Sequence, residues 1–218
     1  MLVERSLHPR HLSNAYLVAD EEGGAALYVD SGAPLAPLQA AVEQWHVKPQ
    51  VVLRTHSHAD HVEHEGELGL PVETGETEVG GLRVEALATP GHSDDMVAFV
   101  VNGEAVFTGD TLFKDAVGGG DFAAIRHAVM AIYMAMPHDH RVFPGHTDET
   151  TIGREWEQNP FVRVWRGVEP EGAERVRVGG EDATLIVWSP DYDGKGKAWV
   201  RFDDGRDAIV GGSRVERA

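Results

Sequence analysis

The chain of 218 residues contains no cysteine. It therefore has neither a disulfide framework nor a thiolate ligand, so any metal site must be built from imidazole and carboxylate groups. No segment approaches the roughly 18 consecutive apolar residues that a membrane-spanning helix needs. The first ten residues also lack the apolar core of a secretory signal. We expect a cytoplasmic protein with no membrane partner.

Basic residues are scarce as well. Nineteen Lys and Arg residues stand against thirty-six Asp and Glu residues, which gives a formal net charge of −17. Such a charge repels phosphate backbones, so we expect a small-molecule substrate and no nucleic-acid partner. The length allows one well-buried core with a small appended module.

The first part of the chain alternates short apolar strands with helical segments, which predicts an α/β fold. Thr151 is expected to cap the last of the predicted helices, and Pro160 to end it at Asn159. Strands are predicted at residues 15–19, 25–30, 51–53, 82–88, 97–101, 105–107 and 141–143, and helices at 34–45, 121–136 and 151–159.

The character of the sequence changes after about Val168. Residues 169–172 are typical of a linker, and three β-like runs follow at 184–188, 197–202 and 207–210. Asp-Tyr-Asp-Gly and Asp-Asp-Gly turns join these runs, as in β-hairpins. We predict a main domain over residues 1–167 and a small all-β module, SH3-like in outline, over 168–218. The module has too little core to stand alone, so it should dock on the main domain.

The segment that carries the chemistry follows the strand at residues 51–53 directly. It reads His56-Ser57-His58-Ala59-Asp60-His61, an HxHxDH motif. Side chains alternate along an extended segment, so His56 and His58 point the same way. Asp60 and His61 can reach a second metal position. Two neighbouring metal ions require this kind of arrangement.

Three later segments each place one ligand-type side chain in a glycine-containing turn after a strand. They are Thr-Pro-Gly-His92, Thr-Gly-Asp110 and Pro-Gly-His146. Loops held by a rigid sheet commonly carry functional groups. His92 or His146 alone would be an ordinary loop histidine, but together with the first cluster they predict a metal site.

The order HxHxDH, TPGH, GDTLF, PGH resembles the metallo-β-lactamase superfamily over residues 10–165. Within it, residues 109–113, 144–155 and 159–161 are similar to the glyoxalase II branch, the hydroxyacylglutathione hydrolases, and its short bacterial relatives. The resemblance implies an αββα sandwich with the site at one edge. It also implies one metal held by His56, His58 and His92, another held by Asp60, His61 and His146, and Asp110 bridging both.

Two divalent ions would generate a bridging hydroxide near neutral pH and polarise a substrate carbonyl. Asp60 is the predicted catalytic residue, placed to orient that hydroxide and accept its proton. Imidazole and carboxylate ligands suit zinc, our first expectation, as well as iron or manganese. Asp30 matches a family aspartate that supports the first histidine loop, although a turn residue after a strand would look the same.

We therefore predict a dinuclear metal-dependent hydrolase of a small thioester. The chain lacks the lysine- and tyrosine-bearing stretch with which glyoxalase II grips glutathione, and the interval from His61 to His92 is short, which predicts an open site. A lactonase is an alternative. A persulfide dioxygenase with one iron on His56, His92 and Asp110 is another, as is a non-enzymatic metal-binding scaffold. Lys114 could meet an acidic substrate group, and His64 lies just past the motif.

Overall fold

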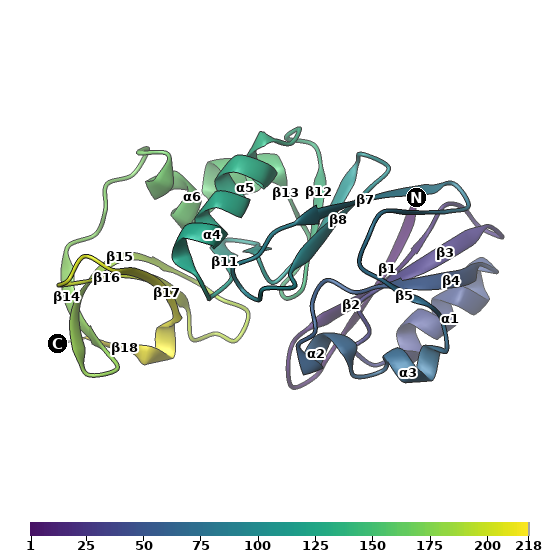
Figure 1. Ribbon diagram of the computed structural model, residues 1–218, viewed down its shortest axis with the longest axis horizontal. Helices are drawn as coiled ribbons and strands as arrows, with labels where there is room; N and C mark the ends of the chain where they lie inside the picture. Colours follow the sequence, from purple (N-terminus) through teal and green to yellow (C-terminus); the bar gives the residue numbers. More distant parts are fainter. Residues whose placement is uncertain (218) are drawn as a thin grey trace.

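Residues 1–217 are described by the computed structural model, in which two β-sheets pack face to face and helices cover their outer faces (Figure 1). The first sheet has the order β1-β2-β3-β4-β5 and the second the order β13-β12-β9-β8-β7-β6. The predicted αββα sandwich is confirmed. The first sheet consists of β1 (Leu2–Leu7), β2 (Asn14–Ala19), β3 (Ala25–Val29), β4 (Lys48–Leu53) and β5 (Val72–Glu73); the second consists of β6 (Thr77–Val79), β7 (Leu82–Ala88), β8 (Val97–Val101), β9 (Ala105–Gly109), β12 (Arg141–Pro144) and β13 (Thr150–Thr151).

Alternation along β2 shows how the layers are built. Tyr16 and Val18 face the second sheet, where Phe107 and Phe143 pack against the Tyr16 ring. Leu17 and Ala19 point the other way, toward α1 (Ala36–Trp45). Successive side chains of a strand take opposite faces, so a strand between two layers is apolar at every position. Two short helices, α2 (Ala59–Val62) and α3 (Glu65–Leu68), complete this side.

The helix predicted at residues 121–136 is divided in the structure. Asp121 caps α4 (Phe122–His127) by accepting a hydrogen bond from the Ala124 amide at 2.7 Å. A π-helical turn, η1 (Ala128–Ile132), and a 3₁₀ turn, η2 (Tyr133–Ala135), then follow. The wider π turn inserts one residue, so Tyr133 is fully buried where the α-helical spacing predicted Ile132.

Thr151 caps α5 (Ile152–Gln158) as predicted, accepting from the Arg154 amide at 3.1 Å. Pro160, however, opens a further helix, α6 (Pro160–Trp165), that the sequence did not predict. Asn159 ends α5 and caps α6, its side chain accepting from the Phe161 amide at 3.1 Å. Proline is favoured in the first turn of a helix, where its missing N–H costs nothing.

The C-terminal segment forms a five-stranded antiparallel sheet of order β17-β16-β15-β14-β18. The predicted runs correspond to β15, β16 and β17, whereas β14 and β18 were not predicted. The sheet docks through Ile186, Val187 and Trp199, which share an apolar cluster with Ile125 and Phe161 of the main sandwich. An SH3-like identity stays a prediction, as does the domain boundary. The strands are β14 (Glu174–Val178), β15 (Glu181–Ser189), β16 (Lys197–Phe202), β17 (Asp207–Gly211) and β18 (Val215–Arg217).

Two very short strands, β10 (Leu112–Phe113) and β11 (Ala116–Val117), pair with each other beyond β9, and a 3₁₀ turn, η3 (Gly212–Arg214), precedes β18. Among the described residues, every helix is too short or too polar to cross a lipid bilayer.

Candidate metal centre

The ends of four strands converge at one edge of the sandwich. The HxHxDH loop follows β4 of the first sheet, and the loop with His92 follows β7 of the second. Asp110 and His146 follow β9 and β12, which are parallel neighbours, so their carboxyl ends lie side by side. The topology therefore brings all seven predicted ligands together: His56, His58, Asp60, His61, His92, Asp110 and His146.

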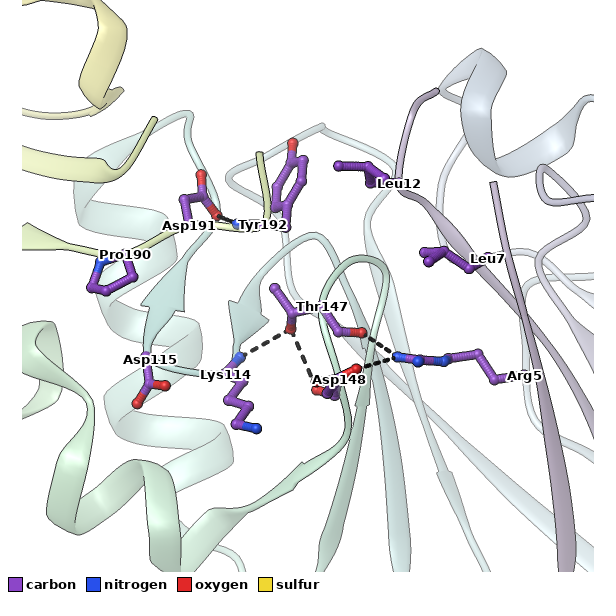
Figure 2. A pocket seen from close by; sticks show the side chains of 10 residues that line it. All are labelled: Arg5, Leu7, Leu12, Lys114, Asp115, Thr147, Asp148, Pro190, Asp191 and Tyr192. Atoms are coloured by element: carbon purple, nitrogen blue, oxygen red, sulfur yellow. Dashed lines mark hydrogen bonds and ion pairs between the residues drawn. The ribbon is translucent and has the colours of Figure 1, made fainter. Parts of the chain in front are cut away.

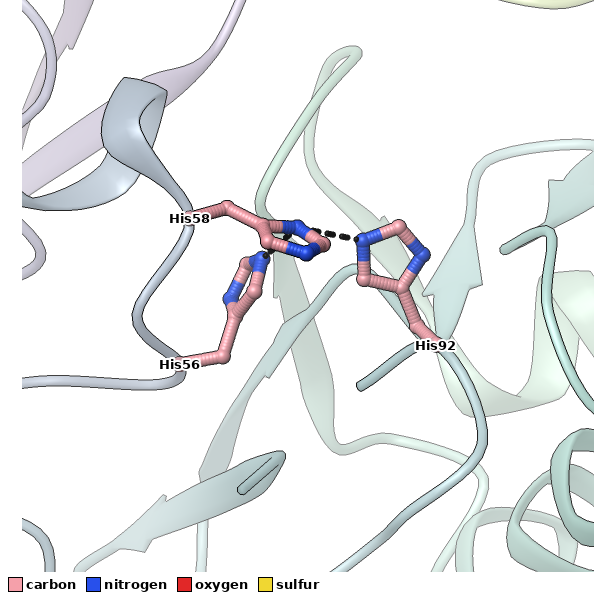
Figure 3. Close-up of side chains that lie close together, drawn as sticks. All are labelled: His56, His58 and His92. Atoms are coloured by element: carbon pink, nitrogen blue, oxygen red, sulfur yellow. Dashed lines mark hydrogen bonds between the residues drawn. The ribbon is translucent and has the colours of Figure 1, made fainter. Parts of the chain in front are cut away.

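Three histidines form the first set (Figure 3). The Nδ1 atom of His58 lies 3.0 Å from Nε2 of His56 and 2.9 Å from Nε2 of His92. Nitrogens that share a tetrahedral zinc at about 2.0–2.1 Å lie about 3.4 Å apart, so small ring rotations would admit an ion. His56 is buried, whereas His58 is exposed.

Asp60, His61 and His146 form the second set. The Oδ2 atom of Asp60 lies 3.7 Å from Nε2 of His61 and 3.7 Å from Nε2 of His146. The Asp60 side chain is 26% exposed, while those of His61 and His146 are almost completely buried. Asp60 is therefore the member of this set that solvent reaches.

Asp110 lies between the two sets. Its Oδ2 atom is 3.5 Å from Nε2 of His92 and 3.2 Å from Nε2 of His146, and its Oδ1 atom is 3.4 Å from Nε2 of His61. One carboxylate thus faces imidazoles of both sets, which is the position that a bridging ligand would need.

Two buried atoms indicate that these residues fit a metal. Nε2 of His61 and Oδ1 of Asp110 are shielded from solvent and have no hydrogen-bond partner among the described residues. Buried polar atoms are rarely left unpaired in folded proteins, and a bound ion can take the place of the missing partner. Imidazole and carboxylate donors in two sets suit divalent ions. The buried histidine and aspartate clusters therefore indicate a metal site.

Hydrogen bonds on the far side of three imidazoles orient their Nε2 atoms toward the centre. The Nδ1 atom of His92 lies 2.9 Å from the Gly119 carbonyl oxygen, and that of His146 lies 2.9 Å from the Leu12 carbonyl oxygen. Nδ1 of His61 lies 2.8 Å from Oδ2 of Asp30. Such contacts fix the tautomer and the direction of the free nitrogen.

The electrostatics show how the cluster behaves without a metal. Burial lowers the pKa of His61, but the Asp110 and Asp30 carboxylates outweigh it and hold this pKa well above 6.5. Burial raises the pKa of Asp110, but His61 and His146 outweigh it and hold this pKa well below 3.8. Burial, with the nearby His61, lowers the pKa of His56 to about 4. Without a metal, these shifts favour a charged His61 imidazole beside an ionised Asp110 carboxylate.

Glycine at position 145 is required by the close approach of the two sets. An added Cβ there would overlap the Asp110 carboxylate and lie 2.8 Å from Cε1 of His61. A side chain of any size at this position would therefore push the ligands apart.

Sequence reasoning missed Tyr192, which stacks on the His146 ring with 4.0 Å between centroids and 9° between planes. Tyr192 lies in the β15–β16 loop, in a turn whose sequence indicates only a hairpin, and no sequence pattern links it to a distant histidine. His64 lies outside the centre, where its Nδ1 atom contacts Oε1 of Glu67 at 2.7 Å.

A cleft of about 310 Å³ has in its wall Tyr192, whose ring stacks on His146 (Figure 2). Its wall includes Leu12, whose carbonyl contacts His146, and Thr147, the residue after His146. The other lining residues are Arg5, Leu7, Lys114, Asp115, Asp148, Pro190 and Asp191.

Comparison with known proteins shows where this centre belongs, although no family model matches the chain. A hydroxyacylglutathione hydrolase from Rhodopseudomonas palustris is 32% identical over 184 residues, covering 72% of this chain and 68% of that protein. An uncharacterized protein from Aquifex aeolicus is 30% identical over 194 residues, covering 68% of this chain and 91% of that protein.

Solved structures agree on the fold. ETHE1 from Myxococcus xanthus superposes with a TM-score of 0.65 at 26% identity, covering 74% of this chain and 84% of that one. TTHA1623 in a di-iron-bound form superposes with a TM-score of 0.58 at 31% identity, covering 72% of this chain and 98% of that one. BLEG-1, a B3 metallo-β-lactamase, superposes with a TM-score of 0.66 at 22% identity, covering 74% of this chain and 99% of that one. With its αββα sandwich and its clustered histidines and aspartates, the chain belongs to the metallo-β-lactamase superfamily.

Proposed function

We propose that the chain is a dinuclear metal-dependent hydrolase of a small thioester. The observation that carries this proposal is the meeting of two complete ligand sets at Asp110. The di-iron form of TTHA1623, at 31% identity, supports two ions. The hydroxyacylglutathione hydrolase at 32% identity supports a thioester as the bond that is cleaved.

His56, His58 and His92 would hold one ion, Asp60, His61 and His146 the other, and Asp110 both. When bound, the ions supply an activated water and polarise the substrate carbonyl. The geometry does not choose among zinc, iron and manganese, and zinc stays our expectation.

The chain's own residues have distinct tasks in this proposal. Asp110 stays ionised because His61 and His146 hold its pKa low, so it can bind cations across the whole physiological range. Asp60 is the solvent-reached carboxylate of the centre, 26% exposed, and it lies equally far from His61 and His146. It is placed to orient a water molecule and to accept its proton.

The cleft beside the centre supports a substrate that carries an acidic group. Four of its five charged lining residues are neutralised in ion pairs: Arg5 and Asp148 with each other at 3.0 Å, Asp115 with Arg154 at 2.9 Å, and Asp191 with Lys197 at 3.0 Å.

Lys114 also lines the cleft, and no carboxylate lies within ion-pair distance of it among residues 1–217. Its ammonium group is thus available to a substrate carboxylate, while Leu7 and Leu12 offer apolar surface to the rest of the molecule. The net charge of −17 supports a small molecule rather than a nucleic acid as the partner. The cytoplasmic location stays a prediction.

A persulfide dioxygenase is the second candidate, favoured by the similarity to ETHE1 at 26% identity. It would need one iron on His56, His92 and Asp110, and it would leave the ligand set of Asp60, His61 and His146 without a purpose. A lactonase would use the same centre as the thioesterase and differ only in the substrate.

The test compares three reactions of the zinc- or iron-reconstituted protein: hydrolysis of S-lactoylglutathione and other acyl thioesters, hydrolysis of lactones, and oxygen uptake with glutathione persulfide. Asp60→Asn keeps the shape of the side chain and removes its basicity, so we expect thioester turnover to fall about 100-fold or more. Asp94→Asn, at an exposed position near His92, is the matched control and should leave turnover unchanged.

Thioester turnover that depends on Asp60 would support the proposal, and lactone turnover with the same dependence would move it to a lactonase. Oxygen uptake with one bound iron and no hydrolysis would overturn it in favour of the dioxygenase.

A further inference from the structure

The β15–β16 loop extends from the C-terminal sheet toward the metal centre (Figure 1). At its tip, the Tyr192 ring lies flat on the His146 imidazole, 4.0 Å away and 9° from parallel. Phe113 meets both rings edge-on, 5.7 Å from each. A residue of the appended sheet therefore contacts a residue of the second ligand set directly.

This loop is anchored on both sides of the tyrosine. The Asp191 carboxylate and the Lys197 ammonium group pair at 3.0 Å, with side chains only 3% and 10% exposed. The same carboxylate accepts a hydrogen bond from the Tyr192 amide at 2.9 Å. The Ser189 hydroxyl donates to the Asp115 carbonyl, which ties the loop base to the main sandwich. The ion pair and the two hydrogen bonds thus tie the loop down on both sides of Tyr192.

His146 needs the support that Tyr192 offers. Its contact with the Leu12 carbonyl, 2.9 Å from Nδ1, sets the direction of the ring in its own plane. Because Nδ1 lies off the Cβ–Cγ axis, this hydrogen bond restrains rotation about that bond only within the angular range that a hydrogen bond tolerates. A stacked ring on one face, with the Phe113 edge beside it, opposes that rotation and keeps Nε2 directed at Asp60 and Asp110.

We propose that Tyr192 is a positioning residue for His146, so that the C-terminal sheet forms part of the active site. The tyrosine holds the imidazole in its ligating orientation and forms the wall shared by the metal centre and the substrate cleft. The inference rests on the proposed metal centre but not on the choice of substrate. It assigns a role in the site to the C-terminal sheet, which lies outside the two sheets of the αββα sandwich.

The experiment measures zinc binding to the full chain by competition with a chelating dye. Variants are Tyr192→Phe, which keeps the ring, and Tyr192→Leu and Tyr192→Ala, which remove it. Lys195→Ala, at an exposed position of the same loop, is the matched control. Loss of a group that orients a metal ligand typically lowers metal affinity about 10–100-fold. We expect such a loss at one of two zinc sites in the Leu and Ala variants, and wild-type affinity in the Phe and Lys195 variants.

A double-variant cycle shows whether the effect passes through His146. His146→Ala should weaken the same zinc site. Adding Tyr192→Ala to it should cause no further loss of zinc affinity, because the effects of two substitutions do not add when one residue acts through the other. Far-UV circular dichroism and the thermal midpoint exclude general unfolding, and Tyr192→Leu retains apolar bulk if Tyr192→Ala is poorly folded.

The inference is overturned if Tyr192→Leu and Tyr192→Ala bind both zinc ions within about twofold of wild type. It is also overturned if the losses in Tyr192→Ala and His146→Ala simply add. Because no substrate is involved, failure of the thioester assay would leave the zinc result intact, and the two failures can be told apart.

Discussion

The carboxylate of Asp30 and the imidazole of His61 meet at 2.8 Å on the side of the ring that faces away from the metal centre. The same carboxylate accepts hydrogen bonds from the Thr55 amide at 2.8 Å and from the Thr55 hydroxyl at 2.9 Å. Asp30 has a left-handed backbone conformation, with φ of +56°, at the end of β3. One buried side chain therefore joins β3, the first histidine loop and a proposed ligand.

Asp30→Asn should weaken zinc binding about 10–100-fold, because a neutral amide orients His61 less firmly and no longer favours its ligating tautomer. It should also lower the free energy of unfolding by about 1–3 kcal/mol, the typical cost of a buried group left without its charged partner. Chelator competition and urea unfolding measure the two effects. Asp20→Asn, in the β2–β3 turn and outside the proposed ligand sets, is the control for zinc affinity; equal zinc affinity in both variants would show that Asp30 is only a turn residue.

Gly145→Ala should abolish activity and reduce the bound metal to less than two ions per chain. The added methyl group would overlap the Asp110 carboxylate and crowd His61. Gly66→Ala is the matched control, since its Cβ would meet nothing within 4 Å, and the helical position favours alanine. Elemental analysis of the purified proteins checks the prediction. Two metals bound in Gly145→Ala would contradict the tight approach of the two ligand sets.

From the groups of the metal centre alone, we expect the free energy of unfolding of the metal-free protein to be greatest near pH 6.5. The raised pKa of His61 stabilises the fold fully below 6.5, the ordinary value, and this contribution is lost as the pH rises through the folded value. His56 acts oppositely: its pKa of about 4 makes the fold lose stability as the pH falls below 6.5.

Asp110 adds a third effect at lower pH. Its lowered pKa stabilises the fold above 3.8 and the contribution disappears as the pH falls through the folded value. Urea unfolding of chelator-treated protein between pH 5 and pH 9 tests the signs for His61 and His56, and extending the series below pH 3.8 tests the sign for Asp110; His61→Gln should remove the decline on the alkaline side. An alkaline decline of the same slope in His61→Gln would show that other groups cause it.

Zinc loading at pH 7 should release a proton from His61, since only the neutral imidazole can bind the ion. His56 should release none, because its pKa of about 4 leaves it neutral at this pH. Calorimetry in buffers of different ionisation enthalpy measures the number of protons. Zinc affinity that does not change between pH 6 and pH 8 would contradict the raised pKa of His61.

Lys114→Met should raise the KM for an acidic thioester about tenfold while kcat changes little. The lysine lines the cleft and has no carboxylate partner among the described residues, so it is placed to bind substrate rather than to act on the reacting bond. A neutral thioester of the same size should be hydrolysed equally by both proteins. A fall in kcat with both substrates would place Lys114 in the centre instead.

Much of the centre could be predicted because its ligands lie in local patterns. A short apolar strand precedes each of four ligands: His56, His92, Asp110 and His146. The end of the apolar run in the sequence marks the end of the strand and so locates the loop that carries the ligand. β7, β8 and β16 have the predicted bounds for the same reason. The types and the order of the ligands along the chain are therefore enough to indicate the superfamily and the seven residues.

Other features depend on partners that are distant in the sequence. β14 has only two apolar residues, Val176 and Val178, and becomes a strand because β15 and β18 pair with it. The π turn after α4 is decided by how Tyr133 packs, since α-helical spacing alone would bury Ile132. In each case a long-range contact outweighs a weak local preference.

The sequence by itself determined the charge of −17 and, through strand periodicity and the HxHxDH motif, an α/β chain with a metal site, while the resemblance of its motif order to the superfamily implied the αββα sandwich and the seven ligand residues. Only the tertiary structure decided that Tyr192 stacks on His146, that Asp30 backs His61 and that Lys114 lines the cleft. These relationships join residues that are far apart in the sequence, and the packing of strands and loops places them at distances that no local pattern encodes.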